Sequence, residues 1–405
     1  DASIERILES CQSYLIDPVN NFLTETFETR LNSLSTDISL SEQQKNNFRS
    51  RHLEVIKNSF LPAYRHLIDG LSGLKGRGIN EGGLCGFRNG RRYYEYLLRS
   101  GPGLSYNIEE LKAALSDRMQ KDLETISSLS KKTGPDLSFR LTDPPAILAD
   151  LQTQMSGDFP VLSESSKKYE IRYVPAQLES TLSPAFYLTA PLDDPTRNVI
   201  YINNGSTSAK DELYPTLAHE GLPGHLYQTV YSSLVCDTQT LPIRKLFSYG
   251  GYVEGWAYYT ERISYEYAAQ VLAEAEGSLG SSYPAALLCT LLAQQRDLQI
   301  NLFCLLDLSL HYYGAEKSEL LRSLESFGLS EEQSERVYDY LRTAPAVYLK
   351  YYVGYLEMNA LKKRAELQWG DNFSLLRFHR FVLEAGPSDF ENLTKRLKQT
   401  AAKTG

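Results

Sequence analysis

The stretch that most constrains this chain is L-A-H-E-G-L-P-G-H-L-Y-Q at 217–228, which places His219, Glu220 and His225 within seven residues. The whole chain has only six histidines, so two of them are concentrated in this short stretch. Neutral imidazoles bind Zn²⁺, and an adjacent carboxylate can accept a proton from a water on the metal. The pattern therefore indicates a zinc site with Glu220 as general base.

The spacing of the two histidines requires a break in the helix that carries them. Residues six apart differ by about 120° in direction on an ideal helix, so His219 and His225 would not face one ion. Pro223 disrupts helical hydrogen bonding, and Gly221 and Gly224 tolerate unusual dihedral angles. We predict a break at 221–224 that returns His225 to the metal. The alternative is a helix that ends at a Gly-Pro-Gly turn and carries two incidental histidines.

A second stretch, Y-G-G-Y-V-E-G-W-A-Y-Y-T-E-R, supplies a candidate third ligand. Glu254 follows His225 by 29 residues, and zinc enzymes of the thermolysin kind use a glutamate for this role. Glu261 lies two helical turns further and could orient a metal ligand. Alternatively, both are ordinary surface glutamates. The aromatic residues around them favour burial, and a buried carboxylate needs a partner.

The two motifs H-E-G-L-P-G-H-L-Y-Q and E-G-W-A-Y-Y-T-E resemble the bacterial family called domain of unknown function 885. The resemblance extends from about Phe60 to about Leu393. Weaker matches include the residues Arg296, Asp307, His311, Tyr351 and Gly354. The chain departs from the family pattern at Ala346, Val347 and Tyr352, where Gly, Gln and Lys are usual.

This resemblance implies a zinc peptidase of the gluzincin type. The expected fold is mainly α with a small β-sheet, an α+β class with a helix-lined cleft. The resemblance implies one Zn²⁺ per chain, held by His219, His225 and Glu254, with Glu261 behind them. Family members are often exported or lipid-anchored, so it also implies an extracytoplasmic location, while the residues themselves leave the location open.

Three segments before the histidine motif are patterned as strands, at 169–173, 185–189 and 198–203. Alternating apolar and polar residues at the first, and short β-branched or aromatic runs at the others, are typical of strands. The resemblance implies that an edge strand lines the cleft and pairs with the substrate backbone. We therefore expect Tyr187 and Asn203 to lie near substrate.

An apolar helix after residue 284 carries a polar stripe made of Arg296, Asp307 and His311. In one interpretation these residues bind a substrate carboxylate, stabilise an oxyanion or support the metal ligands. In the other they form a buried salt bridge with a helix-terminal histidine. Tyr351, on a later helix, is the other candidate oxyanion donor.

Composition sets the remaining bounds. With 42 basic and 50 acidic residues the net charge is −8, and no basic run suggests a nucleic-acid partner. Charged residues interrupt the most apolar stretch, 285–310, so we expect no transmembrane segment. We divide the chain into an N-terminal helical region at 1–132, a sheet and loops at 133–207, and zinc-binding and C-terminal helices at 208–405. The pattern gives no oligomeric state.

Together these features predict zinc-dependent hydrolysis of peptide bonds in short peptides, of the carboxypeptidase or oligopeptidase kind. Two alternatives stay open at this point. One is a zinc hydrolase that acts on a non-peptide amide. The other is a non-catalytic binding protein whose metal site is vestigial or structural, in which four protein ligands would close the site.

Overall fold

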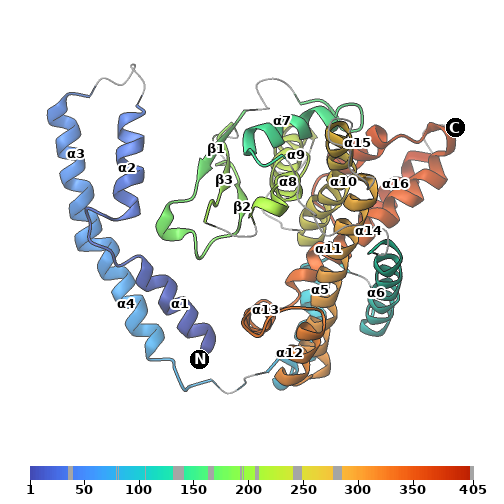
Figure 1. The fold of residues 1–405 in the computed structure, drawn as a ribbon, viewed down its shortest axis with the longest axis horizontal. Helices are drawn as coiled ribbons and strands as arrows, with labels where there is room; N and C mark the ends of the chain where they lie inside the picture. The colour runs from blue at the N-terminus through green and yellow to red at the C-terminus, as the bar shows by residue number, and fades with distance from the viewer. Residues whose placement is uncertain are drawn as a thin grey trace. The chain divides into compact units, whose positions relative to one another are not determined.

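The computed structural model describes residues 1–34, 40–78, 80, 82–104, 106–130, 141–162, 168–191, 194, 196–205, 209–239, 249–276 and 285–401. Within these ranges the chain is mainly helical and has one sheet of three strands (Figure 1). The expected α+β class, with helices predominating, is confirmed.

Two compact units make up the chain. The first comprises Asp1–Glu81 with Val174–Ser183, and the second comprises Gly82–Tyr173 with Pro184–Gly405. The inner boundaries of the expected three-part division, at 132/133 and 207/208, fall outside the described residues, and that division stays a prediction.

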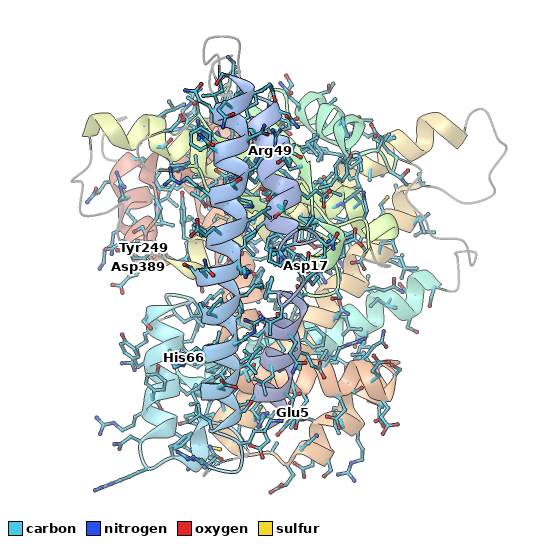
Figure 2. All side chains as sticks on the ribbon, turned by 90° about the vertical axis from the view of Figure 1, so that its left-hand side faces the viewer. Glu5, Asp17, Arg49, His66, Tyr249 and Asp389 are labelled. Atoms are coloured by element: carbon cyan, nitrogen blue, oxygen red, sulfur yellow. The ribbon has the colours of Figure 1, made fainter. Side chains whose placement is uncertain are left out.

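Helices form most of the first unit. They are α1 (Ala2–Ser13), α2 (Phe22–Asn32), α3 (Glu42–Val55), the π-turn η1 (Ile56–Phe60) and α4 (Leu61–Ser72). A capping box between Ser41 and Gln44 starts α3, because each side chain accepts from the other residue's backbone N–H. Arg49 on α3, labelled in Figure 2, pairs with Glu28 on α2 at 2.8 Å. This ion pair connects the two helices.

The second unit contains the sheet and the longer helices. Its helices before the sheet are α5 (Gly90–Ser100), α6 (Ile108–Ser130) and α7 (Pro144–Gln154). After the sheet come α8 (Ala209–Glu220), α9 (His225–Gln239), α10 (Gly250–Glu276), α11 (Ala285–Leu308), the π-turn η6 (Ser309–Tyr313), α12 (Lys317–Ser326), α13 (Glu331–Thr343), α14 (Val347–Trp369), α15 (Leu375–Ala385) and α16 (Phe390–Ala401). Ser330 and Gln333 form a second capping box, at the start of α13.

The sheet has the order β1-β3-β2, formed by β1 (Tyr169–Tyr173), β3 (Asn198–Ile202) and β2 (Ala185–Leu188). β1 and β3 are parallel, whereas β2 is antiparallel to β3 with Tyr187 opposite Ile200. All three predicted strands are confirmed. β2 is an edge strand and packs beside α8, so the sheet edge reaches the histidine motif.

Close packing of α10 against α14 forms the centre of the second unit. Gly255 on α10 and Gly354 on α14 are in backbone contact, because a Cβ on either would overlap the backbone of the opposite helix. Trp256 and Tyr258 are fully buried nearby. This contact fixes the distance between the helix that carries Glu254 and the helix that carries Tyr351. None of the described helices has the length and hydropathy of a membrane span.

Candidate metal centre

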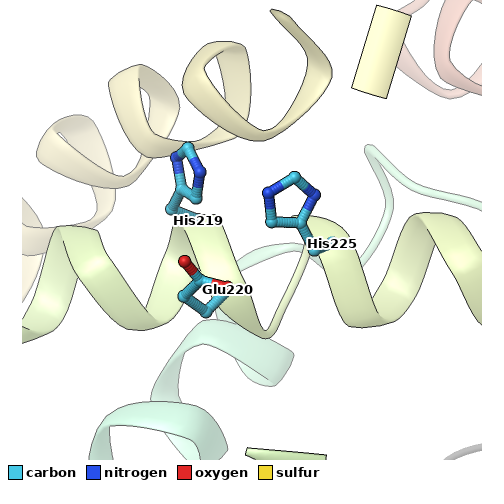
Figure 3. A group of neighbouring side chains, drawn as sticks. All are labelled: His219, Glu220 and His225. Carbon is cyan, nitrogen blue, oxygen red and sulfur yellow. The ribbon is translucent and has the colours of Figure 1, made fainter. Parts of the chain in front are cut away.

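The break expected between the two histidines is confirmed, since α8 ends at Glu220 and α9 begins at His225. Gly224 packs so tightly on the carbonyl of His219 that a Cβ would overlap it. The indole of Trp256 donates to the carbonyl of Pro223 at 2.9 Å and holds the turn from the side of α10. As a result the rings of His219 and His225 lie 4.8 Å apart, almost perpendicular (Figure 3).

Glu254 completes the group. Its Oε2 lies 3.2 Å from Nε2 of His225 and 3.8 Å from Nε2 of His219. This oxygen is buried and has no hydrogen-bond partner of suitable geometry. Ligands at 2.0–2.1 Å from a tetrahedral zinc are separated by about 3.3 Å. The two imidazoles and the unpartnered carboxylate therefore fit a zinc ion in both donor type and spacing.

Glu220 is the other carboxylate within reach. One ligand atom from each of His219, Glu220 and His225 lies within 4.8 Å of the others. However, Oε2 of Glu220 accepts a hydrogen bond of 2.9 Å from the backbone N–H of Tyr187 on β2. We take Glu254 as the better third ligand because its oxygen is closer to both imidazoles and unpartnered. Glu220 is then held beside the group, where a general base would stand.

A chain of contacts supports His219 from behind. Its Nδ1 lies 2.9 Å from Oε2 of Glu261, and Oε1 of Glu261 accepts from Nε of Arg296 at 3.0 Å. Such a carboxylate fixes the tautomer and direction of a metal-binding imidazole. The expected supporting role of Glu261 agrees with this geometry. Arg296 positions Glu261 and also donates to Gln299, while its role toward substrate stays a prediction.

The electrostatics of the group favour a bound cation. Burial by itself would lower the pKa of His219, but Glu254 and Glu261 raise it to about 10. Burial raises the pKa of Glu254, yet the imidazoles of His219 and His225 outweigh it and hold that pKa well below its usual range. The carboxylates are thus ionised and surround the imidazoles with negative charge.

The ring of Tyr351 on α14 stacks on the ring of His219. The two rings are nearly parallel, with centroids 5.8 Å apart. Burial and then the charge of Glu254 raise the pKa of Tyr351 well above its usual value. The phenol therefore stays protonated at neutral pH and can act only as a donor toward an anionic oxygen.

The family model described as "Bacterial protein of unknown function (DUF885)" matches residues 1–397. The chain belongs to this family. No curated protein sequence matches it.

Two solved structures share the fold of this DUF885 chain. A protein from Colwellia psychrerythraea has a TM-score of 0.80 and 16% identity, over 99% of this chain and 70% of that one. A protein of unknown function from Shewanella oneidensis has a TM-score of 0.61 and 16% identity, over 93% of this chain and 70% of that one. Both are described as a "putative lipoprotein". At this identity the likeness concerns the fold alone.

His311 and Asp307 do not contact the metal group, which corrects two expectations for the DUF885 chain. Nδ1 of His311 accepts from the N–H of Leu84 at 3.1 Å, and Nε2 donates to the carbonyl of Leu341 at 2.9 Å. Both nitrogens are occupied by backbone, so the ring has no nitrogen for an oxyanion. Asp307 accepts from the hydroxyl of Tyr94 and from the N–H of Ala346, rather than supporting a metal ligand.

We expected both Asn203 and Tyr187 to lie near substrate, and the structure gives the two residues different surroundings. The side chain of Asn203 is fully buried and accepts from the N–H of Gly205 at 3.1 Å, so it stabilises a turn. This buried position corrects the expectation for Asn203. The backbone N–H of Tyr187 donates to Glu220, and the hydroxyl of Tyr187 donates to Asn198.

Two contacts at the site could not be read from the motifs. The backbone N–H of Tyr187 holds Glu220, but a backbone donor leaves no mark on residue identity. Trp256, in the motif E-G-W-A, indicated burial but not its hydrogen bond to Pro223. A buried indole N–H usually finds a hydrogen-bond partner, so the sequence could predict that Trp256 donates to some acceptor but could not identify that acceptor.

Proposed function

We propose that this DUF885 protein is a zinc peptidase that hydrolyses peptide bonds in short peptides. The observation that carries the proposal is the position of Oε2 of Glu254, which lies 3.2 Å from Nε2 of His225 and 3.8 Å from Nε2 of His219 without a well-aligned hydrogen bond, with Glu220 alongside. A buried carboxylate needs a compensating cation, and a metal ion held between the three groups would supply it. A structural zinc site would use a fourth protein ligand, whereas the nearest candidate, Glu220, is held by Tyr187.

One Zn²⁺ would be held by His219, His225 and Glu254. When bound there, it would lower the pKa of a water molecule and polarise the substrate carbonyl. Glu261 keeps Nε2 of His219 directed at the site by accepting the proton of Nδ1. Arg296 steadies Glu261 in turn.

Glu220 accepts the proton of the attacking water and passes it to the amine that leaves. Its hydrogen bond from Tyr187 fixes one carboxylate oxygen and leaves the other for this transfer. The phenol of Tyr351 donates to the oxyanion that forms as the water attacks. Removing one such donor costs about 3 kcal/mol in other enzymes.

The free edge of β2 is the proposed site for the substrate backbone. Because Tyr187 directs its N–H to Glu220, its backbone faces away from β3, and Ala185 shares this outward side by the alternation of antiparallel strands. An extended peptide could pair there and pass the general base. This edge strand beside the zinc-binding helix is the basis for the gluzincin-like architecture that we propose.

Arg296 is the residue that we propose to recognise the carboxylate end of the peptide. Its Nε and Nη1 are engaged, and its Nη2 makes no hydrogen bond among the described residues. A substrate carboxylate on Nη2 would favour carboxypeptidase or oligopeptidase action. We also propose an extracytoplasmic location, supported by the description of the two structural relatives, which cell fractionation would test.

The first experiment is metal analysis of the purified protein. We expect about one zinc per chain, lost in His219→Ala and Glu254→Ala and retained in His66→Ala. His66 is an exposed histidine on α4 and serves as the matched control (Figure 2). Zinc that is retained in Glu254→Ala would assign the third ligand to another carboxylate. Absence of zinc after incubation with the metal would end the proposal.

The second experiment separates hydrolysis from binding. Glu220→Gln should keep its zinc and lose cleavage of a short-peptide library, while Glu212→Gln, at an exposed position of the same helix, should keep both. Unchanged hydrolysis in zinc-loaded Glu220→Gln would remove Glu220 from its role. If the zinc-loaded wild type cleaves no peptide, the peptidase assignment is wrong, and other amides or a non-catalytic role would follow.

A further inference from the structure

Three tyrosines form a continuous row that ends at the metal group. The ring of Tyr340 on α13 meets the edge of Tyr348 on α14 with centroids 5.6 Å apart. Tyr348 and Tyr351 are three residues apart on α14, which makes them neighbours on the helix surface. Tyr351 stacks on His219. The row therefore leads from the metal ligand outward to Tyr340, whose side chain is 43% exposed.

The hydroxyl groups of this row differ from those of most core tyrosines. Among the described residues of the second unit, seven fully buried tyrosines donate their hydroxyl protons to a partner, whereas the buried hydroxyl of Tyr267 has none; the seven are Tyr94, Tyr214, Tyr227, Tyr252, Tyr258, Tyr259 and Tyr352. Within the described chain, the hydroxyls of Tyr340, Tyr348 and Tyr351 make no hydrogen bond, and none of them is buried. Three phenols in a row are thus available as donors on the accessible side of the metal group.

The row is backed by an apolar ring. Phe303 of α11 packs under Tyr348, with centroids 4.9 Å apart. A flat apolar ring would therefore find aromatic faces on which to pack.

We propose that Tyr340 and Tyr348 form a substrate subsite that takes an aromatic side chain of the peptide. The guest ring packs on Tyr340, and the hydroxyl of Tyr348 donates to a peptide carbonyl beside it. Tyr351, at the inner end of the row, donates to the oxygen of the reacting carbonyl. This inference rests on the proposed peptidase function and adds to it a preference for aromatic residues near the scissile bond.

The test uses the zinc-loaded protein and a set of alanine hexapeptides in which one phenylalanine occupies each position in turn. The wild type should cleave fastest when phenylalanine is at a particular distance from the cut. Tyr340→Ala should lose this advantage by roughly 2- to 13-fold, because one aromatic pair contributes roughly 0.5–1.5 kcal/mol. The loss should be mainly in KM and should be much smaller for the all-alanine peptide, which has no ring to pack on Tyr340.

Two further variants separate ring packing from hydrogen bonding. Tyr340→Phe keeps the ring and should keep the position preference. Tyr348→Phe should weaken the binding of all peptides alike, because it loses only the hydroxyl that donates to a peptide carbonyl. Tyr96→Ala, at an exposed tyrosine on α5, is the control and should match the wild type. A second readout is the Kd of the preferred peptide for zinc-loaded Glu220→Gln, with and without Tyr340→Ala, which should differ by the same factor.

Each result has a defined meaning. An unchanged position profile in a folded Tyr340→Ala protein would overturn the subsite, as would an equal loss on the phenylalanine and all-alanine peptides. If the wild type cleaves none of the peptides, the peptidase function fails, and the subsite is then judged by the Kd of each phenylalanine peptide for zinc-loaded Glu220→Gln. Equal Kd values with and without the Tyr340 ring would reject it.

Discussion

Nδ1 of His219 and Oε2 of Glu261 lie 2.9 Å apart, and this contact directs the other imidazole nitrogen toward Glu254. Glu261 is buried, and Arg296 and His219 hold its pKa below the usual range in spite of that burial. The carboxylate is therefore ionised and keeps a fixed position behind the ring.

Glu261→Gln should lower zinc affinity roughly 10- to 100-fold, because the neutral amide orients the ring less strongly and makes it less basic. A competition titration against a zinc chelator measures the change. Glu266→Gln, at an exposed position of the same helix, should bind zinc as the wild type does. Equal affinities in the two variants would show that Glu261 has no supporting role.

Tyr351→Phe should reduce kcat by roughly 10²- to 10³-fold with little change in KM, since the phenol is proposed to act on the oxyanion rather than on the bound substrate. Steady-state kinetics on a peptide that the wild type cleaves would measure both constants. Zinc content should stay at the wild-type level. A rise in KM with unchanged kcat would instead make Tyr351 a binding residue. Tyr93→Phe, at an exposed tyrosine on α5, is the control.

Ala346→Gly should stabilise the protein by roughly 0.5–1 kcal/mol. Ala346 begins α14 with φ of 63°, a left-handed conformation that costs a residue with a Cβ about 1–2 kcal/mol. The greater freedom of glycine in the unfolded chain offsets part of this gain. Ala344→Gly, two residues earlier at φ of −128°, should destabilise, and urea unfolding of both compares the signs. Loss of stability in both variants would contradict the argument.

Asp307 should make stability fall as pH rises. Burial raises its pKa to about 7, although the hydrogen bonds from Tyr94 and Ala346 oppose this. The folded state then holds a proton that the unfolded state releases above about pH 4, so the contribution declines between about pH 4 and 7. Three pKa units set an upper bound of about 4 kcal/mol.

Asp307→Asn should therefore gain stability relative to the wild type as pH rises from 5 to 8, measured by urea unfolding at several pH values. Asp371→Asn, at an exposed position, should follow the wild-type curve. Parallel curves for wild type and Asp307→Asn would mean that Asp307 has an ordinary pKa.

The local sequence was sufficient to predict those features that depend on the backbone geometry of a single segment. Proline and glycine at 221–224 predicted the break between α8 and α9, and alternation predicted three strands. The helical period between Glu254 and Glu261 placed both on the face of α10 that meets His219. Each of these inferences uses backbone geometry within one segment.

The polar stripe on α11 shows where such reasoning stops. The helical wheel correctly groups Arg296 with Asp307 on one side, but it does not say which segment packs against each of them. Asp307 meets Tyr94 of α5, and His311 meets the backbone of Leu84 and Leu341, both distant in sequence. A buried polar residue is satisfied by whichever donor the tertiary fold supplies, and this donor is not encoded in the spacing.

The departure from the family pattern at Ala346 has a backbone explanation. The glycine that the resemblance implies at this position would suit a positive φ, while this chain accepts the strain with alanine, whose N–H donates to Asp307. The substitution is therefore a matter of conformation at the start of α14.

The contact between Gly255 and Gly354 has a consequence for the stiffness of the candidate metal centre. Two helices that touch through their backbones cannot separate or slide by a change of rotamer, since any shift would bring a side chain into the contact. Glu254 and Tyr351, each within a turn of this contact, therefore move as one rigid body. In the proposed peptidase these two side chains would meet a substrate in a fixed relative position, and an inhibitor that contacts both should lose little affinity to reorganisation of the protein.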